Sequence, residues 1–372
     1  MVDKEIDPII NAQSYIWEKI QKITLSQKIG NAYLFSGPPG CGKEGIAIKL
    51  AQLLNCESRT KNVCGSCASC FRSKSLQHED INIIFPIPIN KKSNPDNDFD
   101  IINNEINKKS KDLFYKVKIP NANRIPISSI RNLRNTLYLS RESYGIKVVL
   151  IFDAHLLAVG QGETANAFLK LLEEPPSRTT FILVTDYINL IPLTIISRCQ
   201  GISFAKLKNS YIESWFKSKM VNREDILLLS GLSRGNIQHA QFFISQSVPA
   251  LIELISGLVN TTTKDNPDDW RLFIQNYSKY AKQDVNKFIN HFMLLKVWFQ
   301  SVNRLQKEIK DPLHHTPLIS EMKKVMSKYP SADFISIVIE LENAINGISM
   351  NLFMPLLLTN LLIKTKIYLN YE

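Results

Sequence analysis

The chain has 372 residues, of which 44% are hydrophobic and 21% are charged, a balance that is typical of soluble globular domains and excludes intrinsic disorder as the default. This length allows two or three domains. The formal net charge of +11 favours contact with polyanions such as nucleic acid, although a dispersed excess of lysine is more often only a solvated surface.

Neither end of the chain predicts a targeting or membrane segment. Residues 1–8 carry acidic side chains and no apolar run, so they do not resemble a secretory signal. The most apolar stretch near the C-terminus, residues 352–363, is interrupted by Pro355, Thr359 and Asn360 and is too short to span a bilayer. We therefore expect a cytoplasmic protein without membrane contact.

The first predicted strand, residues 33–36, leads into a glycine-rich loop with the sequence GPPGCGKE, and a helical pattern follows over residues 45–54. Strand, glycine loop and helix together are typical of a P-loop, in which backbone N–H groups wrap phosphates and a lysine adds positive charge. The candidate phosphate-binding residues are Gly37, Gly40, Gly42 and Lys43.

The next position departs from the P-loop pattern. A Ser or Thr hydroxyl normally holds the magnesium ion there, whereas this chain has Glu44. A longer, negatively charged side chain beside the phosphates disfavours productive Mg-ATP geometry. We expect ATP or ADP binding to remain open at this loop and hydrolysis to be lost.

Four cysteines follow closely, with the spacing C-x7-C-x2-C-x2-C, at Cys56, Cys64, Cys67 and Cys70. In a chain expected to be cytoplasmic, such spacing favours metal over disulfides. Four thiolates complete a tetrahedral Zn²⁺ shell and leave no open position, so the predicted zinc site is structural. His78 is nearby and is expected to lie at the surface.

The polar, lysine- and asparagine-rich stretch from Pro88 to Arg124 is expected to be an inserted, mobile loop. Beyond it, the continuous apolar run of residues 147–152 predicts a strand buried on both faces. That strand ends in Asp153-Ala154, so Asp153 keeps the position of a magnesium-facing acid. No carboxylate occupies the next position, where a glutamate would polarise the attacking water.

A helix over residues 164–174 and a strand over residues 180–185 continue the alternation that predicts a parallel α/β sheet. After about residue 206 only helical periodicity remains. We expect three domains: an α/β P-loop domain over 1–205 with a zinc module at 56–70 and an inserted loop at 88–124, a small helical lid over 206–247, and an all-α oligomerisation (collar) domain over 248–372.

In this order, the motifs resemble the bacterial DNA polymerase III clamp loader, an AAA+ family whose gamma/tau and delta-prime subunits share a P-loop, a four-cysteine insertion and a Leu-Glu-Glu-Pro-Pro run. The matching stretches are AYLFSG at 32–37, the cysteine cluster, NAFLKLLEEPP at 166–176 and TIISRC at 194–199. The C-terminal third shares only helical character.

The resemblance implies roles for three further residues. Arg198, in Ser-Arg-Cys, matches an arginine finger that acts in trans on the ATP of an adjacent subunit, where a guanidinium stabilises the transition state. Thr185 matches the position called sensor one, which touches the γ-phosphate. Gln238 stands where motor subunits have the arginine of sensor two, for which Arg234 is a candidate substitute.

These features favour a stator of the delta-prime type, which lacks its own hydrolysis and joins gamma/tau, delta, the sliding clamp and primer–template DNA. The main alternative is a gamma/tau-like motor subunit that hydrolyses ATP despite Glu44. A third reading, a zinc-dependent DNA-binding module, has only four basic residues near the cysteines to support it: Arg59, Lys61, Arg72 and Lys74.

Overall fold

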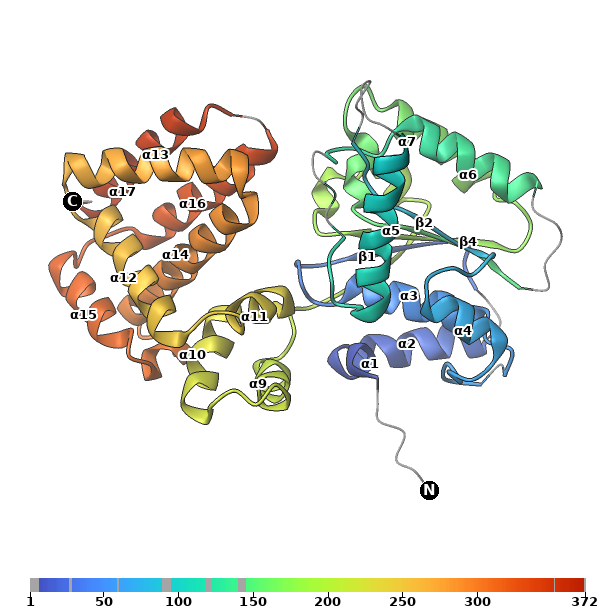
Figure 1. Ribbon diagram of the computed structural model, residues 1–372, viewed down its shortest axis with the longest axis horizontal. Coiled ribbons are helices and arrows are strands. Elements are labelled where there is room, and N and C mark those ends of the chain that lie inside the picture. Colours follow the sequence, from blue (N-terminus) through green and yellow to red (C-terminus); the bar gives the residue numbers. More distant parts are fainter. Residues whose placement is uncertain are drawn as a thin grey trace. The chain divides into compact units, whose positions relative to one another are not determined.

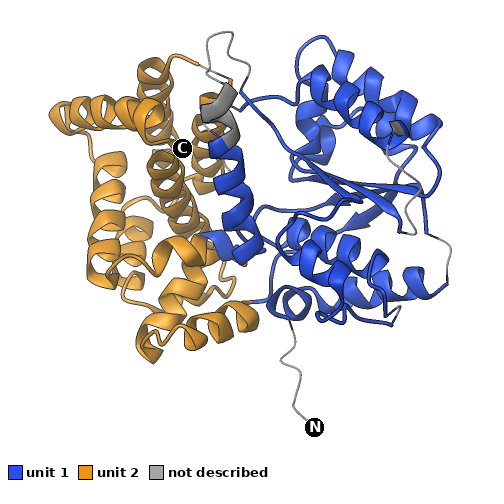
Figure 2. Cartoon of the chain, turned by 45° about the vertical axis from the view of Figure 1, so that its right-hand side comes forward, with its two compact units in different colours: residues 1–208, 236–238 blue, residues 209–235, 239–372 orange. Residues whose placement is uncertain are grey.

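The computed structural model describes residues 7–26, 29–58, 60–88, 95–117, 119, 122–139, 145–350 and 352–370. The chain forms two compact units, one comprising residues 1–208 with 236–238 and the other comprising residues 209–235 with 239–372 (Figure 2). The predicted division into a P-loop domain, a lid and a C-terminal helical domain stays a prediction.

The first unit is built on a five-stranded sheet in the order β2-β3-β4-β1-β5, and all neighbouring strands run parallel (Figure 1). The strands are β1 (Ala32–Ser36), β2 (Ile81–Ile84), β3 (Lys147–Ile151), β4 (Thr179–Thr185) and β5 (Gln200–Ser203). The expected parallel α/β architecture is confirmed, and β2 and β5 are strands that the sequence pattern did not indicate.

Helices cover the sheet, and their bounds are α1 (Pro8–Ala12), α2 (Ser14–Leu25), α3 (Lys43–Leu54), α4 (Ala68–Lys74), α5 (Pro95–Lys111), α6 (Ile127–Leu139), α7 (Glu163–Glu173) and α8 (Leu193–Ile196), with 3-10 turns at Ala154–Ala158 and Ile188–Leu190. Alternate strand residues such as Leu34, Val149 and Leu183 form one core with α6 and α7. The α3 helix contacts β1, β3 and β4. Burial on both faces explains why the central strands are continuously apolar.

The stretch from Pro88 to Arg124 differs from the expected mobile loop, because it contains the 17-residue helix α5. Three lysines lie in its last turn, Lys108, Lys109 and Lys111, where positive charge is favoured by the helix dipole. Residues 89–94, 118, 120 and 121 of this stretch lie outside the described residues. The sequence predicted a loop because this stretch has no long apolar run. The polar side chains of the helix instead make specific contacts, which are described below.

The second unit is helical throughout its described residues. Its helices are α9 (Asn209–Ser218), α10 (Arg223–Ser233), most of α11 (Ile237–Phe243), α12 (Val248–Thr263), α13 (Pro267–Gln283), α14 (Val285–Gln306), α15 (Ile319–Lys328), α16 (Phe334–Ser349) and α17 (Met354–Leu369), with a 3-10 turn at Pro312–His315. Helix α14 is its centre, because Phe288, Phe292 and Trp298 are all buried and a helix that is apolar around most of its circumference must be enclosed by others.

No single helix among the described residues is both long and apolar enough to cross a membrane, and only α11 and α12, taken together across a sharp bend, reach that length and composition.

Candidate functional site

The phosphate loop lies between the end of β1 and the start of α3. Gly40 and Gly42 have φ angles of 68° and 90°, in the left-handed region that side chains disfavour. A Cβ atom at Gly40 would lie 1.7 Å from the Asn236 side chain, and one at Gly42 would lie 3.1 Å from the Phe114 ring. The loop therefore needs glycine for its backbone conformation and for the close approach of these two residues.

Lys43 begins α3 and turns back onto its own loop. Its Nζ atom donates hydrogen bonds to the carbonyl oxygens of Gly37 at 2.8 Å and Pro38 at 2.6 Å, and it forms an ion pair with Asp186 at 2.6 Å. Because only 4% of its side chain is exposed, the ammonium group is fully committed to partners within the chain.

Glu44 and Asp153 lie on either side of one lysine. The Nζ atom of Lys116 is 3.1 Å from Glu44 Oε1 and 2.6 Å from Asp153 Oδ1, and it is 3.5 Å from Asp186 Oδ2. The other oxygen of Glu44 accepts a hydrogen bond of 2.6 Å from Lys109. Three lysines and three carboxylates thus form one network around the start of α3.

The pKa shifts follow from this network. Burial alone would raise the pKa of Glu44, but Lys109 and Lys116 outweigh it and hold that pKa below its usual value. Burial is likewise outweighed at Asp186, whose pKa is lowered by Lys116 and Lys43. At Lys116 burial favours the neutral amine, yet Asp153, Glu44 and Asp186 raise its pKa well above the usual range. At Lys109 burial wins and lowers the pKa.

Little space remains beside this network. The cavity that adjoins Lys43 and Glu44 has a volume of about 20 Å³, which is room for about one water molecule. Its wall includes Phe114 and Gln238, and the Gln238 amide donates to the Phe114 carbonyl at 3.3 Å. A magnesium–nucleotide complex does not fit these residues as they are arranged.

Of the residues expected to sense nucleotide, Thr185 and Arg234 are already bound to other residues of the chain. The Thr185 hydroxyl lies 3.2 Å from His155 Nδ1 and accepts a hydrogen bond from the Tyr187 N–H at 3.0 Å. Arg234, considered as a substitute for the sensor-two arginine, forms a 2.7 Å ion pair with Asp311, within the helical unit. Gln238, by contrast, does line the phosphate-loop cavity.

Arg198 follows α8 and is accessible, with 39% of its side chain exposed. Its Nη2 atom is paired with Glu173 at 2.7 Å, and its Nη1 atom donates to the Thr194 carbonyl at 2.9 Å. Glu173 belongs to the Leu-Glu-Glu-Pro-Pro run at the end of α7. The Leu-Glu-Glu-Pro-Pro and Ser-Arg-Cys motifs are therefore in contact at the surface through Glu173 and Arg198, which are 25 residues apart in the sequence.

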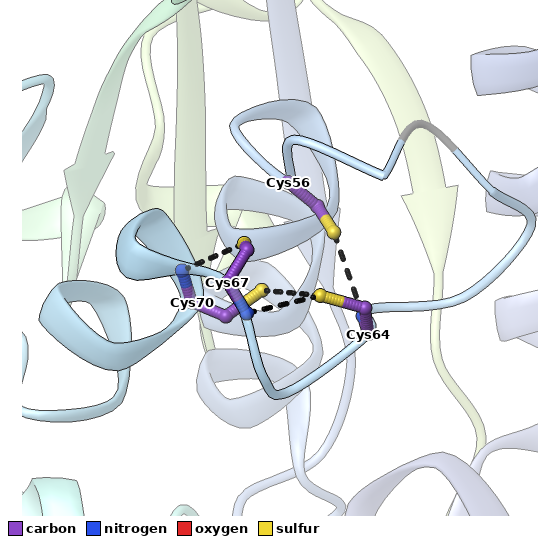
Figure 3. Close-up of side chains that lie close together, drawn as sticks. All are labelled: Cys56, Cys64, Cys67 and Cys70. Atoms are coloured by element: carbon purple, nitrogen blue, oxygen red, sulfur yellow. Dashed lines mark hydrogen bonds between the residues drawn. The ribbon is translucent and has the colours of Figure 1, made fainter.

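The four cysteine side chains point toward a common centre, as Figure 3 shows. Their sulfur atoms all lie within 4.8 Å of one another, and the Cys64 and Cys70 sulfurs are 3.7 Å apart. With Zn–S bonds of about 2.3 Å, two ligands of a tetrahedral zinc lie about 3.8 Å apart. The four thiols fit a zinc ion, which would tie the loop after α3 to α4.

Backbone N–H groups support the thiolate of Cys64, whereas burial raises the pKa of the Cys70 thiol. Cys64 Sγ accepts from the N–H groups of Ser66 at 3.5 Å and Cys67 at 3.4 Å, and these bonds lower the pKa of Cys64 to about 5. His78, expected at the surface, is instead buried and lies 2.9 Å from the Ser69 hydroxyl. The Ser69 hydroxyl also donates to the Asn55 carbonyl at 2.6 Å, so His78 and Asn55 both hold Ser69 at the start of α4.

Sequence reasoning missed Lys109, Lys116 and Asp186 as parts of the phosphate-loop site. Asp186 directly follows Thr185 at the carboxyl end of β4, where ligand-facing residues of parallel sheets gather, so its place was a usable signal. The two lysines lie in or after α5, in the stretch expected to be mobile, and no motif marks them.

Of the basic residues near the cysteines, Arg59 lies outside the described residues, and Arg72 pairs with Glu79 at 3.0 Å.

Comparison with known proteins identifies a family and several relatives of this chain. Residues 12–208 match the family described as DNA polymerase III, delta subunit. The tau subunit of DNA polymerase III from Bacillus subtilis (strain 168) is 30% identical over 220 residues, which are 59% of this chain and 32% of that protein. The gamma/tau subunit from Mycoplasma genitalium is 29% identical over 250 residues, covering 64% of this chain and 36% of that protein.

The matched region spans about one third of the length of these curated relatives. Among solved structures, a DNA polymerase III gamma subunit-related protein from Thermotoga maritima aligns with 95% of this chain and 99% of its own, at 17% identity and a TM-score of 0.41. The Bacillus subtilis clamp loader delta protein aligns with 94% of this chain and 99% of its own, at 11% identity and a TM-score of 0.32.

Proposed function

The chain belongs to the DNA polymerase III delta subunit family, and we propose that within it the chain is a stator of the delta-prime type. In this role it assembles with gamma/tau-type ATPase subunits and a delta subunit, and it supplies Arg198 to the nucleotide of a neighbour. The assembled complex loads a sliding clamp onto primer–template DNA in the cytoplasm, and zinc held by the four cysteines stabilises the fold.

One observation carries the proposal: the Lys116 ammonium group is bound between Glu44 and Asp153. These are the two positions that hold magnesium in an active P-loop site. The residue after Asp153 is Ala154, which is fully buried and cannot polarise water. In this arrangement Glu44 and Asp153 are already paired with Lys116 and the position after Asp153 carries no carboxylate, which supports a subunit without turnover.

Arg198 is the residue through which such a subunit would still act. Its guanidinium is held in place by Glu173 and Thr194 yet remains accessible. An arginine finger in trans contributes about 10³- to 10⁵-fold to the rate of phosphoryl transfer. This supports a role in which the chain lacks hydrolysis at its own loop and contributes to hydrolysis at a neighbouring subunit.

The test is ATP hydrolysis by the assembled clamp loader on primed DNA, with only the ATP site next to this subunit left intact. Arg198→Ala is expected to lower turnover by about 10³-fold without loss of assembly, and Arg198→Lys is expected to remain defective because lysine lacks the planar fork. Arg131→Ala, at an exposed position of α6, is the matched control. Unchanged turnover in Arg198→Ala would contradict the finger assignment.

A gamma/tau-like motor is the second candidate, because the curated relatives reported above are named tau and gamma/tau subunits. The purified chain, with magnesium and primed DNA, separates the two roles. DNA-stimulated hydrolysis that is abolished by Lys43→Ala would establish the motor, whereas no hydrolysis under conditions where a gamma/tau subunit is active would support the stator.

A further inference from the structure

The segment that follows α5 packs directly across the phosphate loop. The Phe114 ring would be 3.1 Å from a Cβ atom at Gly42, and the Leu113 carbonyl oxygen would be 3.0 Å from one at Gly45. Phe114 itself is buried. Leu113, Phe114 and Lys116 also line the small cavity beside the phosphate loop, so residues of the same chain occupy the space next to the loop.

The last turn of α5 and the segment after it together place two ammonium groups at the magnesium-facing positions. Lys116 bridges Glu44 and Asp153, and Lys109 binds the second oxygen of Glu44 while donating to the carbonyl oxygens of Leu113 and Tyr115. Lys109 is only 2% exposed, and a buried ammonium persists only where it is paired and hydrogen-bonded. The buried Lys109 ammonium group therefore depends on these contacts with Glu44, Leu113 and Tyr115.

The network is balanced without any added ion. Its positive groups are Lys43, Lys109 and Lys116, and its negative groups are Glu44, Asp153 and Asp186. Every one of these six side chains has an opposite charge within 3.1 Å. An added Mg²⁺ would repel Lys116 at short range, and added phosphates would have to draw Lys43 away from Asp186.

We propose that the segment from Lys109 to Lys116 is an internal plug, in which the Lys116 ammonium replaces the divalent cation and the chain's own residues fill the phosphate loop. The loop then binds no magnesium–nucleotide in the folded chain. Glu44 has a positive role in this arrangement, since a Ser or Thr hydroxyl could not pair with both lysines as its two carboxylate oxygens do.

The plug proposal shares one assumption with the proposed function: that this loop corresponds to a nucleotide site that does not hydrolyse ATP. The two ideas fail separately. Tight binding of Mg-ATP without hydrolysis would overturn the plug and leave the stator role intact, whereas loss of the Arg198 effect would contradict the stator role and leave the plug intact.

The first test uses the unmodified full chain and lysine acetylation read by mass spectrometry. Lys109 and Lys116 are expected to react at least about tenfold more slowly than Lys111, an exposed lysine in the same turn as Lys109, because Lys109 is buried and Lys116 is held in short ion pairs with Glu44 and Asp153. Mg-ATP at about 1 mM is expected to leave this pattern unchanged and to give no saturable binding heat. Equal reactivity of Lys116 and Lys111, or a Kd below about 100 µM, would overturn the plug.

The second test opens the loop by combining Glu44→Thr, Lys109→Met and Lys116→Ala in the full chain. Provided that circular dichroism matches the unmodified chain, Mg-ATP affinity is expected to rise at least about tenfold, or about 1.4 kcal/mol. The same measurement on Lys111→Ala is the control and is expected to show no gain. A folded, opened variant that binds Mg-ATP no better than the unmodified chain would refute the claim that these lysines exclude nucleotide.

Discussion

Lys109→Met removes one ammonium group from the plug while keeping a side chain of similar length. Breaking a buried ion pair from one side costs about 3–5 kcal/mol, because the remaining charge is left without compensation. Here Glu44 keeps Lys116 at 3.1 Å, which places the expected loss of unfolding free energy at the lower end, about 3 kcal/mol.

The assay is amide hydrogen exchange of peptides from β1, β3 and β4 across a urea series, which reports the first unit separately from the helical unit. With an m-value of about 2 kcal/mol per M, the urea midpoint of these peptides is expected to fall by about 1.5 M. Lys111→Met, the exposed control, is expected to stay within about 0.5 kcal/mol. A loss below about 1 kcal/mol for Lys109→Met would refute the inference that its ammonium group is buried in an essential pair.

Three further predictions concern the zinc module, the carboxylates and the helical unit. The purified chain is expected to contain about one zinc ion, measured by elemental analysis, and Cys64→Ser is expected to lose it and to loosen α4 in hydrogen exchange; a full zinc content in that variant would contradict the ligand set. Because the folded-state pKa values of Glu44 and Asp186 are held below their usual values, their stabilisation is present above about pH 4.3 and is lost as the pH falls through the folded-state pKa. The difference in unfolding free energy between the unmodified chain and Glu44→Gln should therefore shrink in acid, and a difference that is constant down to pH ~3 would contradict this. Asp311→Asn is expected to destabilise the helical unit by about 3–5 kcal/mol, because the buried Asp311 carboxylate pairs with Arg234 at 2.7 Å; thermal unfolding of that unit checks it, and an unchanged melting temperature would show that the pair is dispensable.

The sequence alone was sufficient for the features that depend on local pattern. Continuous apolar runs marked the central strands β3 and β4, since strands enclosed on both faces have no polar side to reveal. Glycine and lysine spacing marked the phosphate loop, and close cysteine spacing marked a cluster whose sulfurs do converge. In each case the physical requirement acts on residues that are near one another in the chain, so the spacing itself carries the information.

Pairing with distant residues decided the rest. The β5 strand, Gln200–Ser203, has no apolar pattern of its own, and it is a strand because it pairs with β1. From the sequence, Glu44 shows only that the Ser or Thr hydroxyl of a P-loop is missing. Its ion-pair partners Lys109 and Lys116 lie 65 residues or more further along the chain. Ion pairs depend on the distance between charged groups in space and leave no periodic trace in the sequence, so only the tertiary structure could turn a lysine-rich insertion into part of the phosphate-loop site.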